Sequence, residues 1–227
     1  MLNDYYSPWI SSDLSSWATV ARPEFLVPMP KGTHIEQGRD NTGYIYLVES
    51  GQLMQTVLSQ SGTERILMFL ASGSLFNEMG LFESAFTFYA VDALVDSRLY
   101  RIPQDRFLHC LHQDNDLCLA LIRQLTRKVA ILAHQTSDLV FGNAYQRIAA
   151  ELLYFVCNHG VPVPGGTMID MDITQQFIAK RINTSRETVC KVMGKMTAAG
   201  ILKKEQGRYV IRDEEALHRA VAALRDT

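Results

Sequence analysis

The sequence contains few cysteines, no long apolar run and no basic start. Its four cysteines are scattered and form no Cys-x-x-Cys pair, so neither a disulfide framework nor a paired-cysteine metal site is expected. No apolar run reaches the roughly 18 residues that a membrane span needs, and Met1 to Trp17 is polar and acidic rather than basic and then apolar. We therefore expect a soluble cytoplasmic protein with reduced thiols and no membrane association.

The sequence also lacks the clustered histidine and carboxylate ligands of a metalloenzyme. His109 and His112 are spaced so that they could share a metal ion, but no third ligand lies near them in the sequence. His34 and His134 are interpreted as structural histidines. No cysteine precedes Cys110, which argues against an iron–sulfur cluster in the first hundred residues. We predict no metal, no cofactor and no enzymatic activity.

Charge, in contrast, is present and unevenly distributed. The formal net charge is −2, yet residues 174–212 hold nine basic and two acidic residues, a net charge of +7 that leaves −9 for the rest. Clustered Lys and Arg neutralise phosphates, so this segment is typical of a separate anion-binding module. A solvated basic face without a partner is the alternative interpretation of the charge alone.

The first half of the sequence reads as short strands punctuated by glycine. Apolar segments at 33–36, 44–48, 52–58, 64–70, 89–94 and 98–102 are short and regularly spaced. This pattern favours an antiparallel barrel or jelly roll. We assign residues 1–114 to such a β-roll, which would sense an effector.

A long helix is predicted next, because residues 116–139 contain no Gly or Pro. Written as heptads, its apolar positions favour two parallel strands in a coiled coil, with β-branched residues at one core position and mainly leucine at the other. These predicted dimer-interface residues are Cys118, Ile122, Leu125, Val129, Leu132, Thr136 and Leu139. A helix buried within one subunit is the alternative, and both can hold, since Leu117, Leu121 and Ala133 lie off the seam. Residues 115–142 are assigned to this dimerisation helix and a hinge.

Two short helices about a tight turn follow, and then a hairpin. Thr174 and Ser185 are each placed to cap a helix, and Asn183 between them tolerates the left-handed conformation that a tight turn needs. Such a pair matches the helix-turn-helix, whose second helix enters the major groove of DNA. Residues 201–212 around Gly207 read as a hairpin wing. We assign residues 143–227 to a winged helix-turn-helix and predict an α+β fold for the chain.

The sequence resembles the CRP/FNR family of transcription regulators. The segments Ile-Thr-Gln-Gln at 173–176, Ser-Arg-Glu-Thr-Val at 185–189 and Ala-Gly-Ile-Leu at 199–202 are similar to that family's DNA-binding signature. The segments at 30–33, 44–51 and 80–83 are similar to parts of its cyclic-nucleotide-type β-roll. The resemblance covers nearly the whole chain. It implies a homodimeric regulator that binds a pseudo-palindromic operator in double-stranded DNA and contacts RNA polymerase.

Carried onto this sequence, the resemblance implies roles for individual residues. Arg186 would read guanine through its guanidinium fork, and Glu187 would accept a hydrogen bond from cytosine N4. Lys191 stands where the family has a second arginine and offers a point charge without the fork. The predicted DNA-binding residues are Thr174, Gln175, Gln176, Ser185, Arg186, Glu187, Thr188, Lys191, Lys203 and Lys204. The alternative for Arg186 and Glu187 is a solvated surface pair.

The sequence departs from the family in the sensor pocket. Cyclic-nucleotide members hold the cyclic phosphate with Arg-Ser, whereas this chain has Phe88-Tyr89 there, and a buried phosphodiester without a cation is costly. We therefore predict a small aromatic or apolar effector other than cyclic AMP. The predicted effector-binding residues are Phe76, Asn77, Glu78, Phe86, Phe88, Tyr89, Arg127, Lys128 and His134.

Two alternatives remain open from sequence alone. One is a constitutive or redox-responsive DNA-binding regulator with a purely structural β-roll, in which Cys190 would be the redox-sensitive residue. The other is a jelly-roll metalloenzyme with an attached helix-turn-helix.

Overall fold

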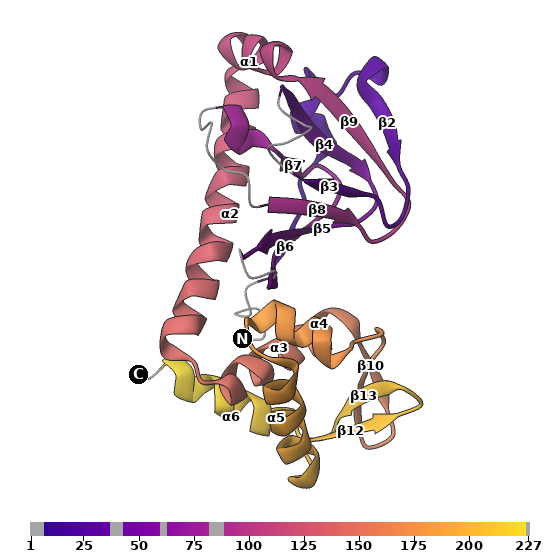
Figure 1. The fold of residues 1–227 in the computed structure, drawn as a ribbon, viewed down its shortest axis with the longest axis vertical. Helices are drawn as coiled ribbons and strands as arrows, with labels where there is room; N and C mark the ends of the chain where they lie inside the picture. Colours follow the sequence, from indigo (N-terminus) through magenta and orange to yellow (C-terminus); the bar gives the residue numbers. More distant parts are fainter. Residues whose placement is uncertain (1–6, 37–42, 60–62, 82–88, 226–227) are drawn as a thin grey trace. The chain divides into compact units, whose positions relative to one another are not determined.

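The computed structural model of the chain describes residues 7–36, 43–59, 63–81 and 89–225 (Figure 1). They form two compact units, residues 8–131 and 132–225. The division falls inside the long helix, and the predicted domain limits at 114 and 142 stay predictions. Phe86 and Phe88 lie outside the described residues.

The first unit is a roll of two sheets. One sheet has the strand order β1-β6-β5-β8-β3 and the other β2-β9-β4-β7; all pairs are antiparallel except β1 with β6. The strands are β1 (Trp9–Ile10), β2 (Leu26–Met29), β3 (His34–Glu36), β4 (Tyr44–Ser50), β5 (Leu53–Leu58), β6 (Glu64–Leu70), β7 (Leu75–Phe76), β8 (Tyr89–Ala93) and β9 (Ser97–Pro103). Three 3₁₀ turns, η1 (Leu14–Trp17), η2 (Pro23–Phe25) and η3 (Glu78–Leu81), and helix α1 (Gln104–Gln113) complete it.

The six predicted strands are all present, with ends within two residues of those expected, and three further short strands were not predicted. β1 pairs with β6, about sixty residues away, so no pattern in the neighbouring sequence predicts this strand. β2 contains Pro28, which argues against a central strand. It is tolerated because β2 lies at the edge of its sheet.

The amino-terminal segment is bound into the roll. Trp17 is fully buried and its indole Nε1 donates to Ser12 Oγ over 2.9 Å. Ser12 Oγ donates in turn to the carbonyl of Gly73 over 2.7 Å, and Ser74 Oγ donates to the carbonyl of Ile10 over 2.7 Å. These bonds fasten residues 10–17 to the loop before β7.

Helix α2 (Asn115–Phe141) confirms the predicted long helix. Its buried face packs on the roll through Leu117, Ala120 and Leu121, as expected for a helix that belongs partly to its own subunit. Gln124 lies on the same face; its Oε1 accepts from the backbone N–H of Leu75 over 2.5 Å, and its Nε2 donates to the carbonyl of Gly73 over 2.9 Å.

The second unit contains a four-stranded sheet and four helices besides the end of α2. Helix α3 (Ala144–His159) starts with a capping box between Asn143 and Gln146. Then follow β10 (Gly160–Val163), β11 (Gly166–Ile169), α4 (Gln175–Ile182), α5 (Arg186–Ala198), β12 (Leu202–Glu205), β13 (Arg208–Ile211) and α6 (Glu214–Arg225). β12 and β13 are joined by Gln206 and Gly207, both with positive φ, as a tight two-residue hairpin requires. The α+β fold predicted from the sequence is confirmed.

Candidate functional sites

The turn between α4 and α5 has the local geometry that the sequence predicts. Thr174 Oγ1 accepts a hydrogen bond from the backbone N–H of Phe177 over 3.0 Å and so caps α4. Asn183 ends that helix in the left-handed conformation, with φ 52° and ψ 62°. Ser185 Oγ then caps α5 by accepting from the backbone N–H of Thr188 over 3.1 Å. Both predicted caps and the predicted turn are therefore present.

Helix α5 buries one face and exposes another. Val189, Met193 and Met196 are buried and anchor the helix. The opposite face presents Arg186 and Glu187 in the first turn and Lys191 one turn later, all exposed as predicted. Ser185 and Thr188, predicted as phosphate contacts, bond to each other through their hydroxyls over 2.9 Å.

The predicted DNA-binding residues leave out three exposed positions on this face of α5: Cys190, Gly194 and Lys195. Their spacing from Arg186 and Lys191 by three or four residues is the signal that could have found them. Gly194 is notable because a Cβ built there would meet nothing within 4 Å. Its own subunit therefore does not require glycine at this position, although glycine in a helix interior costs about 1 kcal/mol.

A buried ion pair holds α4 on α3. Arg181 meets Glu151 through two bonds, Nε to Oε1 over 2.8 Å and Nη2 to Oε2 over 2.9 Å. Both side chains are buried. Arg181 is one of the nine basic residues of segment 174–212. Because Glu151 neutralises its charge inside the unit, that charge is not available to a partner.

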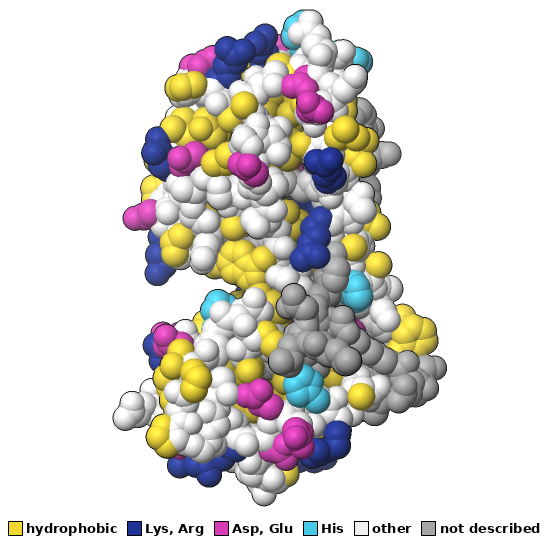
Figure 2. Space-filling model, turned by 180° about the vertical axis from the view of Figure 1, so that it is seen from behind, with side chains coloured by type: hydrophobic (Ala, Val, Ile, Leu, Met, Phe, Trp, Pro, Cys, Tyr) yellow, Lys and Arg dark blue, Asp and Glu magenta, His cyan; other side chains and the backbone are white. Residues whose placement is uncertain are grey.

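The wing divides its lysines between two faces. Lys203 Nζ lies 2.8 Å from Glu205 Oε1, whereas Lys204 Nζ lies 5.4 Å from the centre of the Tyr209 ring. Successive residues of a strand point to opposite faces, so only one of the two lysines faces a given surface. Among the other predicted contacts, Gln176 is exposed and Gln175 is half-buried. Figure 2 shows Lys and Arg side chains along the lower margin of this unit.

The predicted effector residues on β7 and η3 contact other parts of the roll. Phe76 is 0% exposed and its ring stacks on that of Tyr46, with centroids 4.8 Å apart. Asn77, with φ 69°, donates through Nδ2 to the carbonyl of Tyr44 over 2.6 Å. Glu78 is buried and its Oε1 lies 2.6 Å from Lys128 Nζ, which also donates to the carbonyl of Leu75 over 2.9 Å. The acid and the cation predicted for an effector therefore pair with each other.

The remaining described effector candidates are Tyr89, Arg127 and His134. Tyr89 opens β8 and is half-buried, and His134 is exposed on α2. Arg127 lines a hollow between α2 and the amino-terminal segment, together with Arg123 and Ser11, and none of Phe76, Asn77, Glu78 or Lys128 lines that hollow.

The predicted dimer seam on α2 splits into an exposed and a half-buried set. Ile122 and Val129 are 56% and 65% exposed, and Leu132 and Thr136 are exposed as well. Cys118, Leu125 and Leu139 are only half-buried; Leu125 packs against the core of the roll, and Cys118 Sγ donates to the carbonyl of Leu111 over 3.0 Å. Leu119 and Val140, outside the prediction, are exposed on the same helix.

In the described part of the chain, no three His, Cys, Asp or Glu side chains gather as metal ligands. The four cysteines are free, with Cys157 and Cys190 exposed. None of the described helices is long and apolar enough to span a bilayer.

Comparison with known proteins gives two matching family models. Residues 146–220 match the Crp-like helix-turn-helix domain, and residues 26–114 match the cyclic nucleotide-binding domain. The chain is 30% identical over 183 residues to the cAMP-activated global transcriptional regulator CRP of Pasteurella multocida, covering 80% of this chain and 86% of that protein. It is 22% identical over 175 residues to the global nitrogen regulator of Synechococcus elongatus, covering 76% and 79%.

Solved structures share the fold. One is the c-di-GMP responsive global regulator CLP of Xanthomonas campestris, with a TM-score of 0.75, 23% identity and coverage of 88% of this chain and 99% of that chain. The likeness extends over both units of the chain.

Proposed function

The chain belongs to the CRP/FNR family of DNA-binding transcription regulators, and on that premise we propose that it binds a pseudo-palindromic operator as a homodimer in the cytoplasm, where it contacts RNA polymerase. The observation that carries the proposal is the first turn of α5. Its cap at Ser185 leaves Arg186 and Glu187 exposed, with Lys191 one turn further along. A helix that presents long polar side chains at its N-terminus is the element that this class of protein inserts into the major groove.

The chemistry of this face suits base reading. The Arg186 fork matches guanine O6 and N7, and Glu187 can accept from cytosine N4. Lys191 and Lys195 continue the same face toward the phosphates. Gly194 lies between them, and packing within its own subunit does not require a glycine there. The absence of a side chain at this position would let the helix approach the DNA groove closely.

The test compares a base reader with a phosphate contact. Arg186→Ala is expected to lose about 1 to 3 kcal/mol of binding free energy per half-site and to relax the preference at one G·C pair. Lys204→Ala should weaken all sequences alike and reduce the salt slope by about one unit. Binding is measured on operators with single base changes at several salt concentrations. Full base preference in Arg186→Ala, with only the salt slope altered, would refute the assignment of α5.

The homodimer is proposed to form along the exposed stripe of α2, defined as Leu119, Ile122, Val129, Leu132 and Val140. These residues recur at helical spacing on one face, and within the described residues each is between 38% and 66% exposed. A second copy is the occupant that fits, because a two-fold operator needs two reading helices. Ile122 and Val129 are central, whereas Leu125 already contributes to the core of the roll.

Ile122→Lys with Val129→Lys is therefore expected to give a folded monomer, since a dimer would bury four lysines in one seam. Gln113→Lys with Asn115→Lys adds the same charge at exposed positions outside the stripe and should stay dimeric. Light scattering measures both. An unchanged dimer in the first variant would rule out the stripe as the interface.

The effector is proposed to be a small, mainly aromatic or apolar molecule other than cyclic AMP. Phe88-Tyr89 in place of Arg-Ser supports this, as does the Glu78 carboxylate, which is already engaged by Lys128. The relatives are named for different signals, cyclic AMP and nitrogen among them, so family membership alone does not fix the ligand. Calorimetry with millimolar cyclic AMP should show no binding, and micromolar binding would overturn the proposal.

A second candidate is a regulator that needs no effector. The stacked, fully buried Phe76 and the closed Glu78–Lys128 pair favour it, because both fill space with the chain's own groups. Protein unfolded, freed of small molecules and refolded would then bind its operator with undiminished affinity. A loss of affinity that an aromatic metabolite restores would favour the effector instead.

A further inference from the structure

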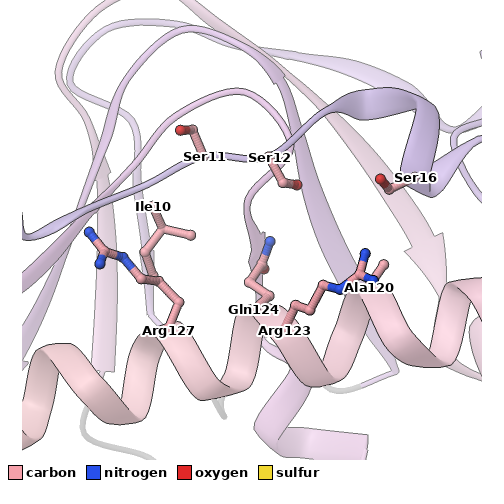
Figure 3. Close-up of a pocket in the computed structure, with 8 residues that line it drawn as sticks. All are labelled: Ile10, Ser11, Ser12, Ser16, Ala120, Arg123, Gln124 and Arg127. Carbon is pink, nitrogen blue, oxygen red and sulfur yellow. The ribbon is translucent and has the colours of Figure 1, made fainter.

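Within the described residues, the roll buries two glutamines whose amide groups differ. Gln124 on α2 is 5% exposed and Gln55 on β5 is 6% exposed. Figure 3 shows Gln124 on the side of α2 that faces the amino-terminal segment, and its amide oxygen and nitrogen are both hydrogen-bonded to the backbone at Leu75 and Gly73. Gln55 Oε1 has no hydrogen-bond partner among the residues that the structure describes. Because most buried polar side-chain atoms are bonded, this amide oxygen calls for an explanation.

Strand pairing places Gln55 among apolar side chains. β5 is the central strand of its sheet, and Gln55 lies directly opposite Met68 on β6 and Val91 on β8. Met68 is 3% exposed and Val91 is 0% exposed. Residues that lie opposite each other on neighbouring strands share a face of the sheet, so the amide of Gln55 projects into an apolar layer. Neither solvent nor the pairing of the strands therefore explains a glutamine at this position.

The same face of the sheet carries a residue that is proposed to bind the effector. Tyr89 begins β8 and lies opposite Val57, two residues beyond Gln55 on β5. Alternate residues of a strand point to the same face, so Tyr89 lies on the face that holds Gln55. Tyr89 is one of the two residues that stand in place of the Arg-Ser of cyclic-nucleotide members. The unpartnered oxygen and this departure from the family thus occur on one surface.

The chemistry of an amide oxygen restricts what can bind beside it. The oxygen accepts hydrogen bonds and carries no full charge, so in apolar surroundings it favours a neutral N–H or O–H donor over a carboxylate or a phosphate. A site that holds a buried acceptor also rejects an analogue without the donor, because the acceptor then stays unpaired. Taking the proposed aromatic effector as the premise, we propose that Gln55 determines its specificity by accepting a hydrogen bond from a hydroxyl or N–H group on the effector.

Gln55→Met tests whether the amide has a structural role instead. Methionine is close to glutamine in length and volume but has no amide. In protein without ligand, the variant is expected to melt about 2 to 4 °C higher, because a buried acceptor without a partner is removed. Gln52→Met makes the same change at an exposed position just before β5 and should shift the melting temperature by less than about 1 °C. A lower melting temperature in Gln55→Met would overturn the proposal, since the amide would then stabilise the fold.

The second measurement uses two pairs of probes that differ in one donor, phenol with anisole and indole with 1-methylindole. Each compound is titrated into the full-length protein by calorimetry. In at least one pair, the compound with the donor is expected to bind about 10-fold or more tightly than its methylated partner. Gln55→Met should reduce the difference within that pair to about 3-fold or less, and Gln52→Met should preserve it. Comparing the variants separates the hydrogen bond from the steric effect of the added methyl group.

Two negative results are distinguishable. If none of the four compounds binds up to about 10 mM, the aromatic effector itself is wrong and the role of Gln55 fails with it. If the compounds bind without a preference for the donor, the aromatic effector stands and Gln55 does not determine specificity. A preference that persists unchanged in Gln55→Met leads to the same conclusion, because another group would then be reading the donor.

Discussion

Among the described residues, each of the two units buries one ion pair, and the two pairs are built differently. In the roll, Lys128 reaches Glu78 through a single contact and shares its ammonium group with the carbonyl of Leu75. In the winged unit, Arg181 and Glu151 face each other through two parallel bonds. Both pairs connect a helix to a neighbouring element of the same unit.

The difference concerns how much geometry each pair specifies. A guanidinium fork on a carboxylate fixes both the distance and the orientation of the two groups, so α4 is held on α3 in one arrangement. An ammonium group on a flexible stem fixes mainly the distance, so η3 can shift relative to α2 without losing the contact. The bidentate pair of the winged unit therefore specifies more of the local geometry than the single contact in the roll does.

Glu151→Gln should show the largest effect. It leaves the buried Arg181 guanidinium without a counter-charge, and a loss of about 3 to 5 kcal/mol in the free energy of unfolding is expected. Both tryptophans, Trp9 and Trp17, lie outside this unit, so far-UV circular dichroism should report an early transition that fluorescence does not. Glu187→Gln, at an exposed position of α5, is the control and should stay within about 0.5 kcal/mol.

Glu78→Gln should cost less, about 2 kcal/mol, because Lys128 keeps the carbonyl of Leu75 and can reorient. Urea denaturation followed by tryptophan fluorescence reports this unit directly. Glu24→Gln, at an exposed position within η2, is the matched control. If Glu78→Gln proved as costly as Glu151→Gln, the two pairs would be equally rigid and the contrast between the units would be wrong.

Ser185→Ala removes the cap of α5 and should destabilise the winged unit by about 1 kcal/mol. Ser185→Asp keeps a capping oxygen and should restore that stability, yet it places a negative charge where DNA phosphates are expected and should weaken operator binding. Thermal unfolding and binding are measured on the same samples. Loss of stability in both variants would contradict the role of the cap.

His34 should show the smallest effect. Its hydrogen bond to Asp92, 2.7 Å long, raises the pKa of the imidazole above its usual 6.5. The stability that the pair contributes is therefore fully present below that usual pKa and is lost as the pH rises through the raised value. Because the ring is half-exposed, the gain is a few tenths of a kcal/mol. His34→Gln should lower the melting temperature slightly at acidic pH and not at alkaline pH; a constant difference would contradict this.

Local features were predictable from the sequence. Each helix cap and the left-handed turn residue depend only on neighbours within three residues, so the local sequence is sufficient to place them. These residues are Thr174, Ser185 and Asn183. The charged face of α5 was predictable for the same reason. The caps set where the helix begins, and the buried residues Val189, Met193 and Met196 set which face points away from solvent.

Contacts between distant residues were not predictable. Arg181 and Glu151 are 30 residues apart and Lys128 and Glu78 are 50 apart, and a periodic pattern contains no information on such partners. The heptad pattern likewise could not show that Leu125 packs against the core of its own roll. Two neighbouring rows of apolar residues on α2 fit the same seven-residue repeat, and the sequence does not say which row faces the roll.

The length of α2 converts small rotations into measurable shifts. From Lys128, where it is fastened to the roll, to its end at Phe141, the helix continues for 13 residues, or about 20 Å at the usual rise. A tilt of about 5° at Lys128 displaces that end by nearly 2 Å, which is comparable with the helix shifts that operate allosteric interfaces. The helix beyond Lys128 is therefore long enough to act as a lever arm, turning a small tilt into a larger displacement of its carboxyl-terminal end.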